Sequence, residues 1–383
     1  MEPYQGLLQQ VKSMTRGLVL AFAVGFAAPS WASEITVASF NVRIFSTGSR
    51  DDSELALIAD RLQQFDLIAI QELRDEEVVR RTLDMLAARG LEYRALVSGP
   101  VGRGSLERYA FLWRPGVVQA LDEGAIFPDP NDVFSREPYV ASFRASNFDF
   151  TLITMHSIWG DSKAERRAEA LLLDDVYRSV QDADPNEQDV IVLGDFNLPP
   201  EDYAFAEMVE VLTPLFTGDR YTTISENAKS LYDNIWLNPG YVAEYTGQNG
   251  IDAFDVMVFN NDDKAASLAV SDHRPVWARF RTDGVDDDAS GSSTATPALR
   301  WGEVKSGIRS TTSALPEGSE LNERMDINAA SKKQLESLPG IGPVIAGRII
   351  SGRPYRRVSD LIQVKGIGPK RLKAIEPLIQ AER

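Results

Sequence analysis

The sequence predicts a four-layer α/β (α+β) sandwich, in which two packed β-sheets are flanked by helices, followed by a small all-α domain. Three features lead to this prediction. Apolar strand-like runs alternate with helical stretches over residues 34–282, a segment rich in Ser, Thr and Asp occupies residues 283–322, and a glycine motif occurs twice within residues 323–383. The spacing of the runs suits two stacked sheets with both outer faces covered.

The amino-terminal segment, residues 1–33, has the features of a signal peptide. Lys12 and Arg16 precede an eleven-residue apolar run, and the small residues Ser30 and Ala32 follow at cleavage-determining positions. Eleven apolar residues are too few to span a bilayer. We therefore expect the mature protein to be secreted or periplasmic and to have no membrane segment. A short buried helix or an uncleaved anchor is the alternative.

Eight apolar runs within residues 34–282 have the length of β-strands. They are Ile35–Val42, Leu67–Ile70, Tyr109–Trp113, Phe148–Met155, Val190–Leu193, Asn234–Leu237, Val256–Phe259 and Pro275–Phe280. Helical stretches separate several of these runs, at Ser53–Gln64, Glu76–Ala88 and Lys163–Gln181. Residues 34–282 are therefore predicted to form one large domain.

Charge is distributed unevenly along the chain. Of a formal net charge of −16, residues 34–323 carry −24, whereas residues 324–383 hold twelve Lys/Arg and five Asp/Glu. A large acidic domain repels a polyanion over about a Debye length. A basic appendage would help such a protein to bind a polyanion, so we expect two modules with different tasks.

The composition of residues 283–322 predicts a flexible linker. Beyond it, Leu338–Pro343 recurs 26 residues later as Val364–Pro369, and each copy predicts two helices joined by a tight glycine turn. Such a turn directs backbone N–H groups towards an anion. Two hairpins that only pack together, with the glycines as caps, are the alternative. The predicted phosphate-binding residues are Gly340, Gly342, Gly366, Gly368, Lys365, Lys370 and Arg371.

Cysteine and histidine usage limits the chemistry of the large domain. The chain has no cysteine, which excludes disulfides, zinc–thiolate sites and thiol nucleophiles. It has two histidines, His156 and His273. Imidazole chemistry therefore has two candidates, and little room is left for a histidine-rich metal site.

Polar side chains occur in the large domain where predicted strands end or begin. We expect them to converge at one rim of the sandwich. Their carboxylate and amide oxygens suit Mg²⁺, Mn²⁺ or Ca²⁺ rather than Zn²⁺, and two imidazoles accompany them. An ordinary turn or a structural histidine is the alternative for each motif taken alone. The residues are Asn41, Glu72, His156, Asp195, Asn197, Asp233, Asp272 and His273.

Phosphodiester hydrolysis needs groups of these types. A metal ion neutralises the developing charge, a base activates water, and an acid protonates the leaving oxygen. An imidazole held by a carboxylate serves either proton-transfer role near neutral pH. The cluster therefore favours a phosphodiesterase.

The segments that contain these residues resemble the endonuclease/exonuclease/phosphatase superfamily, and within it the deoxyribonuclease I-like enzymes. The resemblance implies the sandwich fold and a metal-dependent endonuclease that cuts DNA with little sequence specificity. The shared segments are Ser39–Arg43, Ile70–Asp75, Glu107–Leu112, Phe134–Pro138, Met155–Ser157, Gly194–Asn197, Tyr232–Asp233 and Ser271–Pro275.

The resemblance also implies roles for single residues. Glu72, Asn41 and Asp272 would hold Mg²⁺, with Mn²⁺ as the alternative ion. His156 with Glu107 and His273 with Asp233 would be the two acid/base pairs, with the assignment of acid and base left open. Asp195 and Asn197 would orient the phosphate or the attacking water. Arg74 and Arg136 match positions that touch DNA, with a surface ion pair as the alternative, and Asp132 and Glu137 match a structural Ca²⁺ site.

The carboxyl-terminal repeat resembles the ComEA-type helix-hairpin-helix domain, including its lead-in Asp326–Ser331. This resemblance implies sequence-independent binding to the backbone of duplex DNA, because phosphate contacts carry no base information. We expect a monomer. Two other functions stay open: a phosphodiesterase of the same superfamily that acts on another substrate, such as a phospholipid headgroup, and a non-catalytic DNA-binding or uptake protein.

Overall fold

The computed structural model describes residues 33–102, 106–160, 162–184, 188–225, 229–284, 325–336, 338, 341, 343–368, 372, 375 and 379–381. The predicted signal peptide and nearly all of the predicted linker lie outside the described residues. So do four of the predicted phosphate-binding residues, Gly340, Gly342, Lys370 and Arg371. No helix in the described ranges is long and apolar enough to cross a membrane.

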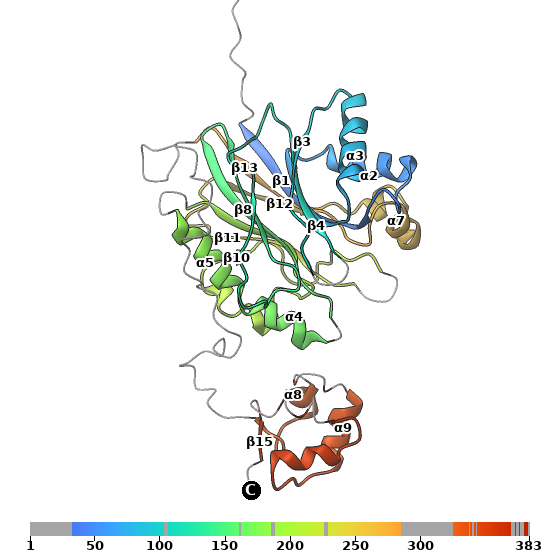
Figure 1. Cartoon of the computed structure of the whole chain (residues 1–383), viewed down its shortest axis with the longest axis vertical. Coiled ribbons are helices and arrows are strands. Elements are labelled where there is room, and N and C mark those ends of the chain that lie inside the picture. Colours follow the sequence, from blue (N-terminus) through green and yellow to red (C-terminus); the bar gives the residue numbers. More distant parts are fainter. Residues whose placement is uncertain are drawn as a thin grey trace, which may run out of the picture. The chain divides into compact units, whose positions relative to one another are not determined.

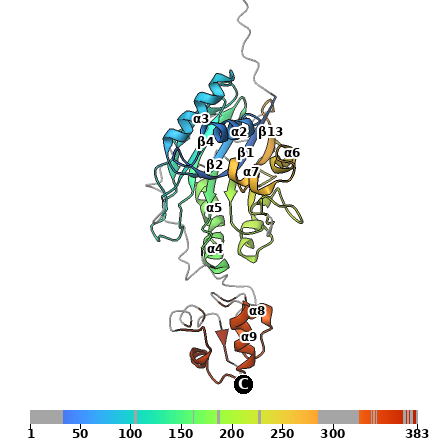
Figure 2. The ribbon, with the colours of Figure 1, turned by 90° about the vertical axis from the view of Figure 1, so that its right-hand side faces the viewer.

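Within the described residues, six strands form the first sheet, in the order β12-β13-β1-β2-β4-β3. Strands β1 and β2 are parallel, and the other neighbours are antiparallel. The strands span Tyr245–Ile251 (β12), Val276–Arg281 (β13), Glu34–Phe45 (β1), Leu67–Leu73 (β2), Arg108–Trp113 (β4) and Arg94–Val97 (β3). Helices α2 (Asp52–Leu62), α3 (Glu76–Ala88) and α7 (Asp263–Ala269) lie in front of β1, β2 and β4 in Figure 2.

The second sheet has seven strands in the same part of the chain, in the order β10-β11-β9-β8-β7-β5, with β6 also paired to β7. Strands β8 and β9 are its parallel pair. The bounds are Thr213–Pro214 (β10), Asp233–Leu237 (β11), Val190–Asp195 (β9), Phe148–His156 (β8), Tyr139–Ala145 (β7), Gln119–Ala120 (β5) and Ala125–Ile126 (β6). The outer face packs against α4 (Lys163–Ala170), α5 (Leu173–Ala183) and the short helices η1 (Tyr203–Phe205) and η2 (Met208–Glu210).

The four layers enclose three apolar cores, which confirms the predicted sandwich (Figure 1). Strand β1 shows how alternation divides its side chains. Ile35 and Val37 pack into the core between the sheets, and Phe40 and Val42 pack under the helices. The same alternation points Asn41 to the inter-sheet side. A polar residue at that position reaches the end of the second sheet.

One predicted strand is wrong. Val256–Phe259 overlaps helix α6 (Phe254–Met257), where Val258 N–H donates to the carbonyl of Phe254 at 2.8 Å. The run looks like a strand because it is apolar, but Val256, Met257 and Val258 are exposed. Phe254 is buried in the core, and Phe259 packs against it partly buried.

The predicted helix Lys163–Gln181 is two helices, α4 and α5, interrupted at Leu171 and Leu172. Leu172 and Leu173 are both buried. Consecutive residues of one helix point about 100° apart, so the break allows both side chains to enter the same core.

The carboxyl-terminal domain combines short helices with one strand pair. Strand β14 (Met325–Asp326) pairs in parallel with β15 (Ile379–Gln380). Between them in the sequence come α8 (Lys332–Glu336), α9 (Pro343–Ser351) and the 3₁₀ helix η3 (Val358–Gln363). Its buried core includes Ile327, Leu335, Ile349, Leu361 and Ile375. Arg348 of α9 donates to the carbonyl of Lys365 at 2.7 Å, so α9 is tied to the second glycine turn. Gly366 in that turn has φ +108°, a conformation that only glycine adopts readily.

Strand β9 lies very close to β8 at Gly194. A Cβ atom on Gly194 would lie 2.1 Å from the carbonyl oxygen of Met155, and the φ angle of Gly194 is +151°. Backbone atoms of a central strand cannot move aside as a flexible side chain does. Glycine is therefore required just before Asp195.

We expect Gly194→Ala to lower the free energy of unfolding by about 3 kcal/mol, because the clash separates two central strands. Urea unfolding of the full chain measures this loss. Gly116→Ala is the control, because a Cβ at Gly116 would meet nothing within 4 Å. Equal stability of the two variants would show that the strands tolerate a wider spacing.

Candidate active site

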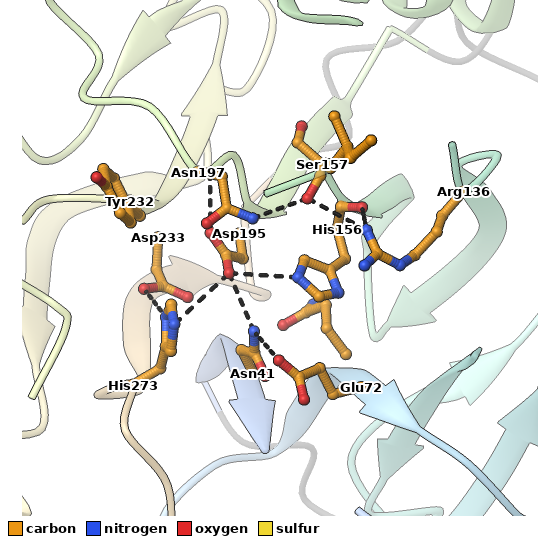
Figure 3. A network of polar contacts seen from close by, with 12 residues as sticks. Asn41, Glu72, Arg136, His156, Ser157, Asp195, Asn197, Tyr232, Asp233 and His273 are labelled. Atoms are coloured by element: carbon orange, nitrogen blue, oxygen red, sulfur yellow. Dashed lines mark hydrogen bonds and ion pairs between the residues drawn. The ribbon is translucent and has the colours of Figure 1, made fainter. Parts of the chain in front are cut away.

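Strand register brings three predicted site residues side by side. Asp195 ends β9, and it pairs with His156 at the end of β8 and with Asp233 at the start of β11. Asn41 approaches from the first sheet, and His273 from the segment before β13. Figure 3 shows these side chains around one central carboxylate.

Asp195 is that central carboxylate. Its Oδ2 atom lies 3.6 Å from Nε2 of His156 and 3.7 Å from Nε2 of His273. The same oxygen accepts a hydrogen bond from Asn41 Nδ2 at 3.0 Å, and Oδ1 accepts one from the backbone N–H of Asn197 at 2.9 Å. Both imidazoles therefore present Nε2 to the same small region.

His156 contacts the carboxylate of Glu107. Its Nδ1 lies 2.8 Å from Glu107 Oε2. The guanidinium groups of Arg136 and Arg74 lie 3.0 and 3.2 Å from Glu107 Oε1. Burial raises the pKa of Glu107, but His156 and the two arginines outweigh it and hold the pKa at about 2. Glu107 is therefore ionised at neutral pH.

His273 forms the second pair, with Asp233. Its Nδ1 lies 2.7 Å from Asp233 Oδ2. Burial lowers the pKa of His273, but the carboxylates of Asp233 and Asp195 raise it well above the usual range. Burial raises the pKa of Asp233 in turn, and Asp195 adds to the increase. The two His–carboxylate pairs therefore differ in their electrostatics.

Glu72 and Asn41 meet at an irregular part of the first sheet. Glu72 has a φ of +58°. At this position the pairing of β2 shifts register with both of its neighbours, β1 and β4. Such a bulge re-aims a side chain, and a left-handed glutamate is strained. The Glu72 carboxylate accepts hydrogen bonds from Asn41 Nδ2 at 3.3 Å and from Ile44 N–H at 2.9 Å.

The oxygen atoms near Glu72 fit a hard divalent cation. Asn41 Oδ1 is buried and has no hydrogen-bond partner in the described part of the chain, and a buried amide oxygen of this kind is suited to a metal ion. Asp272 lies beside His273; its side chain is 42% exposed, and its carboxylate lies 3.9 Å from Arg43 Nε. Burial raises the pKa of Asp272; His273 lowers it, and Glu72 raises it. A second group with metal-ligand atoms within 4.8 Å of one another is Asp195, Asp233 and His273.

Asn197 connects the end of β9 to the end of β8. Its Nδ2 donates to the carbonyl of Ser157 at 2.8 Å, and its φ is +51°, which asparagine tolerates better than most residues. Arg136 donates to the carbonyls of His156 and Ser157 at 3.0 and 3.3 Å. Arg136 and Arg74 thus contact Glu107 and the site backbone, and the predicted contact with DNA stays a prediction.

Two positioning residues were not identified from the sequence. Glu169 in α4 accepts hydrogen bonds from the N–H groups of Ser135 and Ile158 at 2.7 and 2.8 Å, and burial raises its pKa to about 7. Ser271 donates to the carbonyl of Asn41 at 2.6 Å and accepts from His273 N–H at 3.1 Å. Ser271 lies in the shared Ser271–Pro275 segment, whereas Glu169 looks like any glutamate of a surface helix.

Comparison with known proteins identifies the class. Residues 38–273 match the model of the Endonuclease/Exonuclease/phosphatase family, and residues 321–380 match that of the helix-hairpin-helix motif. The chain belongs to the Endonuclease/Exonuclease/phosphatase family. It is 31% identical to a protein named deoxyribonuclease from Thioalkalivibrio sp. (strain K90mix), over 95% of this chain and 96% of that protein.

Animal proteins are similar over the large domain. Deoxyribonuclease-1 of Oryctolagus cuniculus is 31% identical over 64% of this chain and 92% of its own length. Among solved structures, an endonuclease/exonuclease/phosphatase from Bacteroides vulgatus is 18% identical, covers 65% of this chain and 99% of its own, and has a TM-score of 0.48.

We expect Glu107→Gln to reduce the acid sensitivity of the fold. The folded pKa of about 2 lies below the ordinary 4.5. Ionised Glu107 therefore stabilises the fold above pH 4.5, and this stabilisation is lost as the pH falls towards 2. The shift corresponds to about 3 kcal/mol. Urea unfolding at a series of pH values measures it.

The expected result is a fall in the free energy of unfolding between neutral pH and about pH 2 that is about 3 kcal/mol larger in the wild type than in Glu107→Gln. Glu210→Gln, which changes an exposed residue of η2, should retain the wild-type slope. Parallel curves for the wild type and Glu107→Gln would contradict the assignment.

Proposed function

We propose that this chain is an exported, Mg²⁺-dependent endonuclease that hydrolyses phosphodiester bonds of DNA with little sequence specificity. The observation that carries the proposal is the pair of imidazoles, each held through Nδ1 by a carboxylate and each presenting Nε2 to Asp195. The relative named deoxyribonuclease, which aligns with 95% of the chain, supports DNA as the substrate.

The two His–carboxylate pairs supply the proton transfers. A carboxylate on Nδ1 fixes the orientation of each ring and leaves Nε2 free to exchange a proton with the substrate or with water. One imidazole takes the proton of the attacking water, and the other gives a proton to the leaving oxygen. Asp195, which lies between the two rings (Figure 3), and Asn197 beside it would orient the phosphate or the attacking water.

Glu72, Asn41 and Asp272 would hold the metal ion. The orphaned oxygen of Asn41 and the re-aimed carboxylate of Glu72 support this choice, and Mg²⁺ or Mn²⁺ suits such ligands. A bound ion supplies charge neutralisation at the phosphoryl oxygens. Asp132 and Glu137 remain the predicted site of a structural Ca²⁺.

The carboxyl-terminal domain would tether duplex DNA. Its match to the helix-hairpin-helix motif and its excess of basic residues support this role. A second binding site on the same chain raises the effective concentration of substrate at the catalytic domain, provided that the linker spans both sites.

Incubation of the mature protein with supercoiled plasmid tests the catalytic proposal. We expect nicking with Mg²⁺ and none after removal of the metal by a chelator. His156→Ala and His273→Ala should each reduce the nicking rate at least a hundredfold, because general acid–base catalysis contributes about 10²- to 10⁴-fold. Gel electrophoresis over time measures the rates.

Glu210→Gln is again the control and should nick as the wild type does. Full activity of either histidine variant would overturn the proposed mechanism. An inactive wild type that still retards DNA on a gel would favour a binding protein instead.

A second variant tests the tether. Lys365→Glu combined with Lys370→Glu should weaken binding of the full chain to a long duplex about tenfold, because two phosphate contacts are lost. It should slow degradation of long DNA more than cleavage of a twelve-base-pair duplex. Arg80→Glu combined with Arg94→Glu makes the same charge change at exposed residues of the large domain. Equal effects of the two double variants would contradict a tethering role.

A further inference from the structure

A pair of aromatic rings, one of them exposed, lies beside the catalytic cluster. Trp159 follows His156 by three residues and is 56% exposed. Its ring meets that of Tyr232, which directly precedes Asp233, edge to face with 5.9 Å between the centroids. These two rings, the aromatic platform, join the segments that follow β8 and precede β11. Asp195 ends the strand between β8 and β11, so the platform belongs to the rim of the site.

The Trp159 ring is held in place by Arg166, which packs against one of its faces. The guanidinium carbon of Arg166 lies 4.1 Å from its centroid, and Arg166 is itself 8% exposed. Arg166 also donates to the carbonyl of Asn197 at 3.1 Å. A cation over one face of an indole is stabilising and fixes the ring. More than half of the surface of Trp159 nevertheless remains open to solvent.

A basic groove begins at the platform. A cavity of about 400 Å³ is lined by Tyr232 and by three cationic residues, Lys163, Arg220 and Lys229. Asp219 is the one acidic residue of its lining. Lys163 follows Trp159 by four residues and begins helix α4. Lys229 also lies 3.9 Å from Asp263 Oδ2. The cations still outnumber these two carboxylates, in contrast with the large excess of acids in this part of the chain.

Aromatic rings next to a track of cations suit an unpaired nucleic-acid strand. Bases stack on the rings whatever their sequence, and the cations hold the backbone phosphates. A base inside a duplex is already stacked on both faces and cannot reach a protein ring without being extruded. A phospholipid headgroup has no aromatic face to stack. The combination therefore favours nucleic acid, in single-stranded form.

We propose that Trp159 and Tyr232 stack against an unpaired base of the strand being cut, and that Lys163, Arg220 and Lys229 hold the phosphates beside it. The site would then accept single-stranded DNA, or DNA opened at a mismatch or an end, in addition to duplex. This inference rests on the proposed nuclease function.

Trp159→Ala tests the platform in the full chain. We expect it to lower kcat/KM for a single-stranded oligonucleotide about tenfold, as base–aromatic stacking predicts, and to lower the value for a duplex of the same sequence by a smaller factor. Trp159→Phe should retain most of the activity on the single strand, because it keeps a ring.

Tyr203→Ala is the matched control. Tyr203 is 57% exposed and lies under Arg167, with 4.4 Å from the guanidinium carbon to the ring centroid. Tyr203 is thus an exposed ring that contacts an arginine, as Trp159 does, but it lies in η1 and contacts Arg167 instead of Arg166. This variant should cut both substrates as the wild type does. An equal loss on both substrates for Trp159→Ala, or no loss on either, would overturn the proposal.

A binding measurement separates the platform from the chemistry. In the His156→Ala background, a short single-stranded oligonucleotide should quench tryptophan fluorescence, and Trp159→Phe should remove most of that quenching. If the wild type cuts neither substrate, the nuclease proposal fails. The quenching experiment still tests whether the aromatic platform binds a single strand. If the wild type cuts duplex but neither binds nor cuts the single strand, the platform proposal alone fails.

Discussion

The pairing of β9 with its two neighbours is the constraint on which the catalytic cluster depends. The register sets His156, Asp195 and Asp233 on three adjacent strands at one level. Side chains alternate between the faces of a strand, so a slip of one residue would turn Asp195 towards the wrong layer. The close approach of the strands at Gly194 opposes such a slip.

Burial raises the pKa of both carboxylates, but different neighbouring charges give the two His–carboxylate pairs different electrostatic properties. Glu107 is compensated by two guanidinium groups as well as by His156, and its pKa is held low. Asp233 lies against His273 with the Asp195 carboxylate close by, and its pKa is raised. When their surroundings give two like groups different pKa values, one site can carry out both acid and base chemistry. The asymmetry comes from arginines on other segments, and the pairs look alike in the sequence.

The ends of strands were predictable from the sequence because an apolar run followed by a polar residue is a local pattern. This pattern located Asn41, His156 and Asp195. Strand β12 was missed because it contains Gly, Gln and Asn and is only partly buried. Glu169 was missed for another reason: the N–H groups that it accepts from are 34 and 11 residues away, and no local pattern marks such a partner. Pairings across the fold came from the family resemblance.

Net charge is a poor guide to where this chain would meet a polyanion. The chain before the carboxyl-terminal domain is strongly acidic, yet Arg74 and Arg136 lie at the site, and Lys163, Arg220 and Lys229 line the groove beside it. Screening limits the range of interactions between exposed charges to about 8 Å at physiological ionic strength. A phosphate group at the site would therefore interact mainly with these nearby cations. The carboxyl-terminal domain would then act by keeping DNA near the site. Cancelling the charge of the large domain would not be its main task.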